Sequence, residues 1–139
     1  MEGKQRILIV SDDSDMQMYL SSLLHDHDLE PLVARTEDEG VRAAGMKRLR
    51  CVVLDMMMQG EAAFSLYRRL KCHQRLCQLP VMMLSPIDSK TFLRYQKLKQ
   101  NDPGQVVPVP EAYMERPPEA EDFICQVCQW ASVSGAEPQ

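Results

Sequence analysis

Short apolar runs alternate along this chain with longer stretches whose apolar residues recur at helical spacing. Three runs, at residues 7–10, 51–54 and 81–84, consist of aliphatic residues without polar interruption, which is typical of buried strands. Shorter strand candidates lie at 31–33 and 112–114, and helical patterns at about 14–25, 36–47, 61–72, 88–100 and after residue 118. This alternation predicts βαβ units with right-handed crossovers and therefore a parallel sheet.

The residues that end these strands are the candidate chemistry. Asp55 closes the 51–54 run, and an acidic stretch that begins with Ser11 and Asp12 follows the first strand. Ser85 follows the 81–84 run, and Arg116 follows the last strand. In open α/β sheets, ligands bind at the carboxyl ends of the strands. The sequence therefore predicts a site of carboxylates, a hydroxyl and a cation that can hold a divalent metal together with a phosphoryl group.

With four such stretches in this order, the chain resembles the response-regulator receiver domain, the phosphoacceptor module of two-component signalling. The resemblance is carried by residues 7–16, 51–60, 79–85 and 113–127 and covers about residues 5–131. It implies a flavodoxin-like, doubly wound α/β fold, in which a five-stranded parallel sheet of order 2-1-3-4-5 is flanked by five helices. We expect a stand-alone receiver domain at 5–131 and a short polar tail at 132–139, with no output domain after it.

The resemblance also implies the chemistry. A sensor histidine kinase would transfer a phosphoryl group to Asp55, and the domain would then signal to a downstream protein target through protein–protein contacts rather than act as an enzyme. Asp12 and Asp55 would be Mg²⁺ ligands, with the backbone carbonyl of Met57 as a third, since Mg²⁺ prefers oxygen ligands and retains several waters. Ser85 would hydrogen-bond a phosphoryl oxygen, and Arg116 would pair with its negative charge.

Two positions depart from the family pattern. The family has two adjacent acids after the first strand; counting back from Met16 places Ser11 and Asp12 there, so a hydroxyl replaces one acid. The other register, with Asp12 and Asp13, would turn the faces of the strand over. We prefer the first register, in which Asp13 is an N-terminal acid of the following helix. Arg116 stands where the family has lysine, which preserves the charge but changes its shape. A degenerate receiver that docks proteins without phosphorylation is therefore the alternative hypothesis.

Three further positions bear on signalling. Met57 and Ile87 stand where family members often carry polar groups that orient attacking water, so we expect slow hydrolysis of a phosphoryl-aspartate. The absence of an acid at Met57 also disfavours a hydrolase of the aspartyl-phosphate type. Tyr113 stands at the aromatic position that changes rotamer in the family, although simple packing is an equal alternative.

The extended stretch around 101–112 is longer than usual and is interpreted as a surface insertion, with partner contact as the alternative.

Composition and charge limit the kind of protein that this sequence can encode. The 139 residues suit one domain, with 45% hydrophobic and 26% charged residues. A net charge of −4 argues against nucleic acid as the main partner. No stretch is long enough to span a membrane and no signal peptide is evident, so we expect a cytoplasmic protein.

The five cysteines form an odd set that does not suggest a disulfide framework. Cys125 and Cys128 have redox or zinc spacing, and Cys72, His73 and Cys77 could complete a zinc site. We prefer to interpret the cysteines as buried small hydrophobes, since the two groups are expected on opposite faces of the sheet. A thiol-redox protein using Cys125 and Cys128 is the hypothesis from another functional class.

Overall fold

A computed structural model describes residues 4–46, 48–88, 90–91 and 108–135. Within them the chain forms five strands, four α-helices and one short 3₁₀ helix. Their bounds are β1 Arg6–Val10, α1 Ser14–Asp26, β2 Glu30–Ala34, α2 Glu37–Met46, β3 Cys51–Asp55, α3 Ala62–Lys71, η1 Leu76–Gln78, β4 Val81–Ser85, β5 Ala112–Glu115 and α5 Ala120–Gly135.

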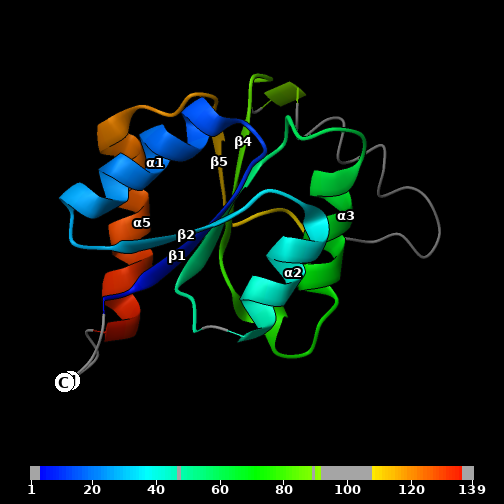
Figure 1. Cartoon of the computed structure of the whole chain (residues 1–139), viewed down its shortest axis with the longest axis horizontal. Helices are drawn as coiled ribbons and strands as arrows, with labels where there is room; N and C mark the ends of the chain where they lie inside the picture. Colours follow the sequence, from blue (N-terminus) through cyan, green and yellow to red (C-terminus); the bar gives the residue numbers. More distant parts are fainter. Residues whose placement is uncertain (1–3, 47, 89, 92–107, 136–139) are drawn as a thin grey trace.

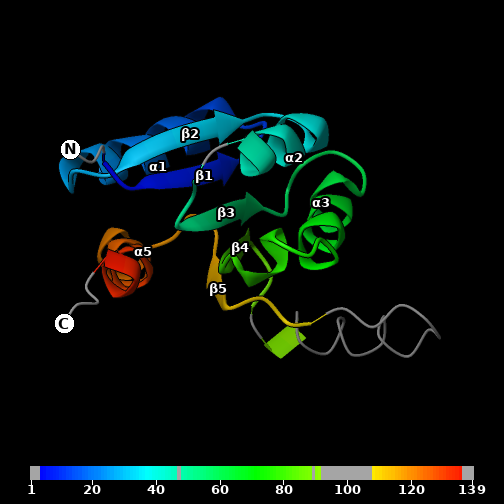
Figure 2. The same ribbon diagram turned by 90° about the horizontal axis from the view of Figure 1, so that it is seen from below.

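All five strands are parallel and their order is β2-β1-β3-β4-β5, as the sequence predicts. Helices α1 and α5 cover one face of the sheet, and α2 and α3 cover the other (Figures 1 and 2). The doubly wound, flavodoxin-like architecture is therefore confirmed, with four rather than five α-helices in the described part. The helix expected at 88–100 and the stretch at 101–107 lie almost entirely outside the described residues.

The sheet has a hydrophobic core on each face, because successive residues of a strand point in opposite directions. From β1, Ile7 and Ile9 pack toward α1 and α5, whereas Leu8 and Val10 pack toward α2 and α3. All four side chains are fully buried. Continuous apolar runs are the expected signature of strands that are covered on both sides.

Helices α1 and α2 begin with side-chain caps at the residues that the sequence indicates. Asp13 is the N-cap of α1, since its side chain accepts the N–H groups of Asp15 and Met16. At α2, the Thr36 hydroxyl accepts the N–H of Glu39 at 3.1 Å. The Glu39 carboxylate reaches back to the N–H of Arg35, at 2.8 Å, one residue earlier than in the usual capping box.

The position of β5 depends on a buried lysine. The Lys71 side chain is only 4% exposed, and its ammonium lies 2.8 Å from the carboxylate of Glu111, directly before β5. The same carboxylate accepts the N–H of Val81, at the start of β4, at 2.8 Å. Helix α3 and strand β4 thus hold the residue that leads into β5, the strand that carries Arg116 at its end.

Helix α5 continues to Gly135, so residues 132–135 are helical rather than part of the tail expected there. None of the helices among the described residues is long and apolar enough to cross a membrane.

The expectation of buried cysteines is correct only for Cys51, whose burial raises its pKa to about 12. Cys72 and Cys125 are exposed, and Cys77 and Cys128 are half-buried. On α5 a residue two positions from a core residue points away from the sheet, and Cys125 lies two positions after the buried Phe123. The two cysteine groups lie on opposite faces of the sheet, as expected.

Candidate functional site

The carboxyl ends of β1, β3, β4 and β5 bring the candidate residues together. The register of β1 and β3 places Ser11, directly after β1, beside Asp55, the last residue of β3. Ser85, the last residue of β4, lies one position beyond Asp55 in the register of β3 and β4. The backbone N–H of Arg116 donates to the carbonyl of Ser85 at 2.9 Å. The parallel topology, rather than proximity in the chain, therefore builds this site.

The Asp55 carboxylate is 1% exposed and accepts four hydrogen bonds. Its Oδ1 accepts the N–H of Met57 at 3.0 Å and Nε of Arg116 at 2.9 Å. Its Oδ2 accepts the Ser11 hydroxyl at 2.7 Å and Nη2 of Arg116 at 3.3 Å. An ionised carboxylate has about four acceptor positions, so this one is saturated. Such saturation, together with the guanidinium charge, is what allows a carboxylate to be buried.

Arg116 also contacts a second acid. Its Nη2 lies 2.6 Å from Oδ2 of Asp13, while Asp13 caps α1 with its other oxygen. This hydrogen bond is the main reason why the pKa of Asp13 is lowered. Burial alone would lower the pKa of Arg116, but the hydrogen bonds to Asp55 and Asp13 outweigh it and raise that pKa. One guanidinium thus bridges two carboxylates across β3, β5 and the start of α1.

Sequence reasoning missed two of these contacts. In the sequence, Ser11 is noted only as a hydroxyl that replaces an acid of the family pattern, but its buried side chain donates directly to Asp55. The rule that selects Asp55, its position at the end of a strand, could also have found Ser11. Asp13 is confirmed as a helix N-terminal acid, but its bond to Arg116 has no local sequence signal. That bond depends on how far an arginine side chain reaches across the sheet edge.

Of the Mg²⁺ ligands expected from the sequence, Asp55 is held by Arg116 and Ser11, and Asp12 makes no contact with this network. The Asp12 side chain is exposed, and within the described part of the chain it makes no hydrogen bond or ion pair. The Met57 N–H donates to Asp55. Among the described residues, no group of three or more His, Cys, Asp or Glu side chains could hold a metal ion. With the Arg116 guanidinium between them, Asp13 and Asp55 do not fit a shared Mg²⁺ ion.

Ser85 lies in a tight turn beside Tyr113. The serine is 4% exposed, and its Oγ accepts the N–H of Ile87 at 3.2 Å. The Tyr113 hydroxyl donates to the carbonyl of Ile87. Burial raises the pKa of Tyr113, while a hydrogen bond to Ser85 opposes the increase. The tyrosine is thus connected directly to the turn that carries the site hydroxyl.

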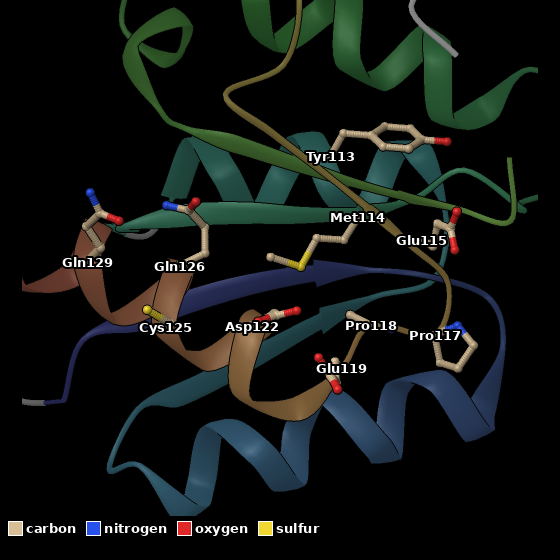
Figure 3. A pocket seen from close by; sticks show the side chains of 10 residues that line it. All are labelled: Tyr113, Met114, Glu115, Pro117, Pro118, Glu119, Asp122, Cys125, Gln126 and Gln129. Carbon is tan, nitrogen blue, oxygen red and sulfur yellow. The ribbon is translucent and has the colours of Figure 1, made fainter. Parts of the chain in front are cut away.

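A groove of about 620 Å³ runs between β5 and the first part of α5 (Figure 3). Its lining includes the carboxylates of Glu115, Glu119 and Asp122. A side-chain hydrogen bond with Asp122 raises the pKa of Glu119, and the negative charge of Asp122 raises it further. The groove is therefore acidic.

Comparison with known proteins agrees with this architecture. The response regulator receiver domain family matches residues 7–103. Protein PilH of Pseudomonas aeruginosa is 33% identical over 87 residues, which cover 62% of this chain and 71% of PilH.

Solved structures share the fold at low sequence identity. The receiver domain of the Francisella response regulator 1452 has a TM-score of 0.73 at 20% identity, covering 94% of this chain and 99% of its own. The Vibrio cholerae chemotaxis response regulator CheY4 has a TM-score of 0.74 at 17% identity, covering 91% of this chain and 98% of its own. The family match covers most of the sequence, and the strand order β2-β1-β3-β4-β5 is the one that the family resemblance implies. The chain belongs to the response regulator receiver domain family.

Proposed function

We propose that the chain is a receiver that accepts a phosphoryl group on Asp55 from a sensor histidine kinase and signals through contacts with a downstream protein. The observation that carries this proposal is the buried Asp55 at the end of β3, with Arg116 Nε at 2.9 Å and Ser85 on the neighbouring strand. An acid, a hydroxyl and a fixed cation at one sheet edge are what phosphoryl transfer to a carboxylate needs.

In the transfer, one carboxylate oxygen of Asp55 forms a P–O bond while the P–N bond of the donor phosphohistidine breaks. The electron pair of the broken bond stays on the imidazole nitrogen. The Ser85 hydroxyl can donate to a phosphoryl oxygen, and Arg116 can neutralise the negative charge that the group brings. Because both oxygens of Asp55 are saturated, the attacking oxygen must first lose one of its present hydrogen bonds.

The phosphorylated state should be long-lived. Met57 and Ile87 flank the site with side chains that are 54% and 45% exposed. Neither side chain can position a water molecule by hydrogen bonding. Slow hydrolysis of the phosphoryl-aspartate would suit a protein whose signal lasts as long as its complex with the target.

The contact surface proposed for the target is the β5–α5 side. Tyr113 joins the segment after Ser85 to β5, and the next residues of that strand, Met114 and Glu115, line the groove, so a change at Asp55 has a short path to this surface. The acidic lining favours a partner segment that carries Lys or Arg.

Intact-mass spectrometry after incubation with a small phosphodonor tests the proposal. We expect the gain of one phosphoryl group in the parent chain and none in Asp55→Asn, with Asp12→Asn and Asp15→Asn as comparisons among the other acids of the region. No gain from folded protein, with a working receiver treated in parallel, would contradict the proposal.

A second candidate function, a docking module that needs no phosphate, is favoured by the saturated carboxylate of Asp55. In that case Asp55 and Arg116 would be a structural ion pair that fixes one conformation. Target binding that is equal for the parent and Asp55→Asn would support this alternative, because the first proposal requires the two to differ after phosphodonor treatment.

A further inference from the structure

We infer that the guanidinium of Arg116 is the resident cation of this site, and that its bridge between Asp13 and Asp55 excludes a divalent metal. The inference rests on the acidic site of the proposed function but not on phosphoryl transfer itself. It concerns how this chain balances its own buried charge, where the family resemblance implies Mg²⁺.

The geometry is the first argument. The Nη2 atom of Arg116 lies 2.6 Å from Oδ2 of Asp13 and 3.3 Å from Oδ2 of Asp55. A metal shared by the two acids would have to lie between the same two oxygens. Mg²⁺ requires oxygen ligands at about 2.0–2.1 Å in near-octahedral arrangement, whereas a guanidinium nitrogen already fills this space.

The charges are the second argument. Asp13 and Asp55 carry two negative charges, and Arg116 offsets one of them at contact distance. A Mg²⁺ ion beside these acids would also lie beside a cation of the same sign. Asp12, the remaining acid after β1, is exposed and makes no described contact with the bridge. A metal between Asp13 and Asp55 would therefore compete with Arg116 both for their oxygens and for their negative charge.

The two departures from the family pattern complement each other in this arrangement. Ser11 donates a hydrogen bond to Asp55 at 2.7 Å, where a carboxylate would have added a further negative charge. Arg116 contacts Asp55 through both Nε and Nη2 and still reaches Asp13. A lysine ammonium carries its three donors on one nitrogen and has no planar fork, so it cannot contact Asp55 through two nitrogens while it reaches Asp13. The Ser11 hydroxyl and the Arg116 guanidinium thus take the places that an acid and Mg²⁺ have in the family pattern.

A Mg²⁺ titration of the full chain tests the inference, with the backbone N–H of Met57 as the NMR reporter because it donates to Asp55. The variants are Arg116→Lys, which keeps the charge but not the bridge, and Arg116→Gln, which removes both. Arg69→Lys is the matched control, since Arg69 joins Glu37 and Asp38 on the surface. Each titration is repeated with NaCl at equal ionic strength.

In the parent chain and in Arg69→Lys, we expect the Met57 signal not to saturate up to about 10 mM Mg²⁺. We expect Arg116→Lys to bind Mg²⁺ at least tenfold more tightly than the parent chain. Parent protein that saturates well below that concentration would overturn the inference. So would an Arg116→Lys variant whose affinity stays within twofold of the parent, because the bridge would then not matter. If Arg116→Lys fails to fold, Arg116→Gln is judged by the same two criteria.

Failure of the inference and failure of the proposed function are distinguishable. A parent chain that takes up no phosphoryl group, with Mg²⁺ binding gained in Arg116→Lys, would refute the function and leave the inference intact. A parent chain that takes up phosphate and also binds Mg²⁺ tightly would do the reverse.

Discussion

Replacing Ser11 by alanine should measurably destabilise the fold, although the change removes a single oxygen. The Ser11 hydroxyl donates to Asp55 at 2.7 Å, and the two residues are 0% and 1% exposed. Water cannot take the place of the lost donor, so the carboxylate keeps its charge with one partner fewer. A hydrogen bond to a charged group contributes about 1.5–3 kcal/mol, and we expect a loss of about 2 kcal/mol in the free energy of unfolding.

Urea unfolding followed by circular dichroism measures this loss. With a slope of about 2 kcal/mol per molar urea, the midpoint should fall by about 1 M. Ser65→Ala is the matched control, because the Ser65 hydroxyl donates to Glu37 at 2.6 Å but the Glu37 side chain is 23% exposed. Water can replace that donor, so the control should lose only about 0.5–1 kcal/mol. Equal losses in the two variants, or a loss below about 0.5 kcal/mol for Ser11→Ala, would refute the reasoning.

Two further predictions concern pH and packing. Because Arg116 lowers the pKa of Asp13 in the folded chain, the stabilisation from Asp13 is present above its ordinary pKa and is lost as the pH falls through the lowered value. The difference in urea midpoint between the parent and Asp13→Asn should therefore shrink from pH 6 to pH 3, and a constant difference would contradict this. In α2, a Cβ at Gly40 would lie 2.9 Å from Cδ2 of the buried Leu66, whereas a Cβ at Gly45 would meet nothing within 4 Å. Alanine at either position gains about 0.5–1 kcal/mol of helix propensity, so we expect Gly45→Ala to stabilise by that amount in thermal or urea unfolding. At Gly40 the overpacking cost of about 1–3 kcal/mol exceeds this gain, and we expect a net loss of about 0.5–2 kcal/mol; effects of the same sign would count against this packing.

Much of the fold could be predicted from the sequence because its signals are local. The run that ends at Asp55 is apolar throughout, since both faces of a central parallel strand are covered. The caps at Asp13 and Thr36 involve residues three positions apart or fewer. Each of these features is visible in a short window of the chain.

The parts of the site that could not be predicted depend on side-chain reach. The distance between Arg116 and Asp13 is set by the order of the strands and by the arginine rotamer, and neither appears in a motif. A motif position predicts Asp12 as a metal ligand, whereas the acid that contacts Arg116 is Asp13; Asp12 is exposed directly after β1.

The central claim is that Arg116 holds the buried carboxylate of Asp55. The most direct measurement is the solvent exchange of the Arg116 Nε–H group, observed by ¹⁵N NMR at neutral pH and assigned with Asp55→Ala. Arg69 serves as the internal reference, because its side chain is 46% exposed and makes its described ion pairs through Nη1. The account predicts an Arg116 signal that exchanges far more slowly than that of Arg69 and loses this protection in Asp55→Ala. An Arg116 signal that exchanges as fast as that of Arg69 in the parent chain would contradict it.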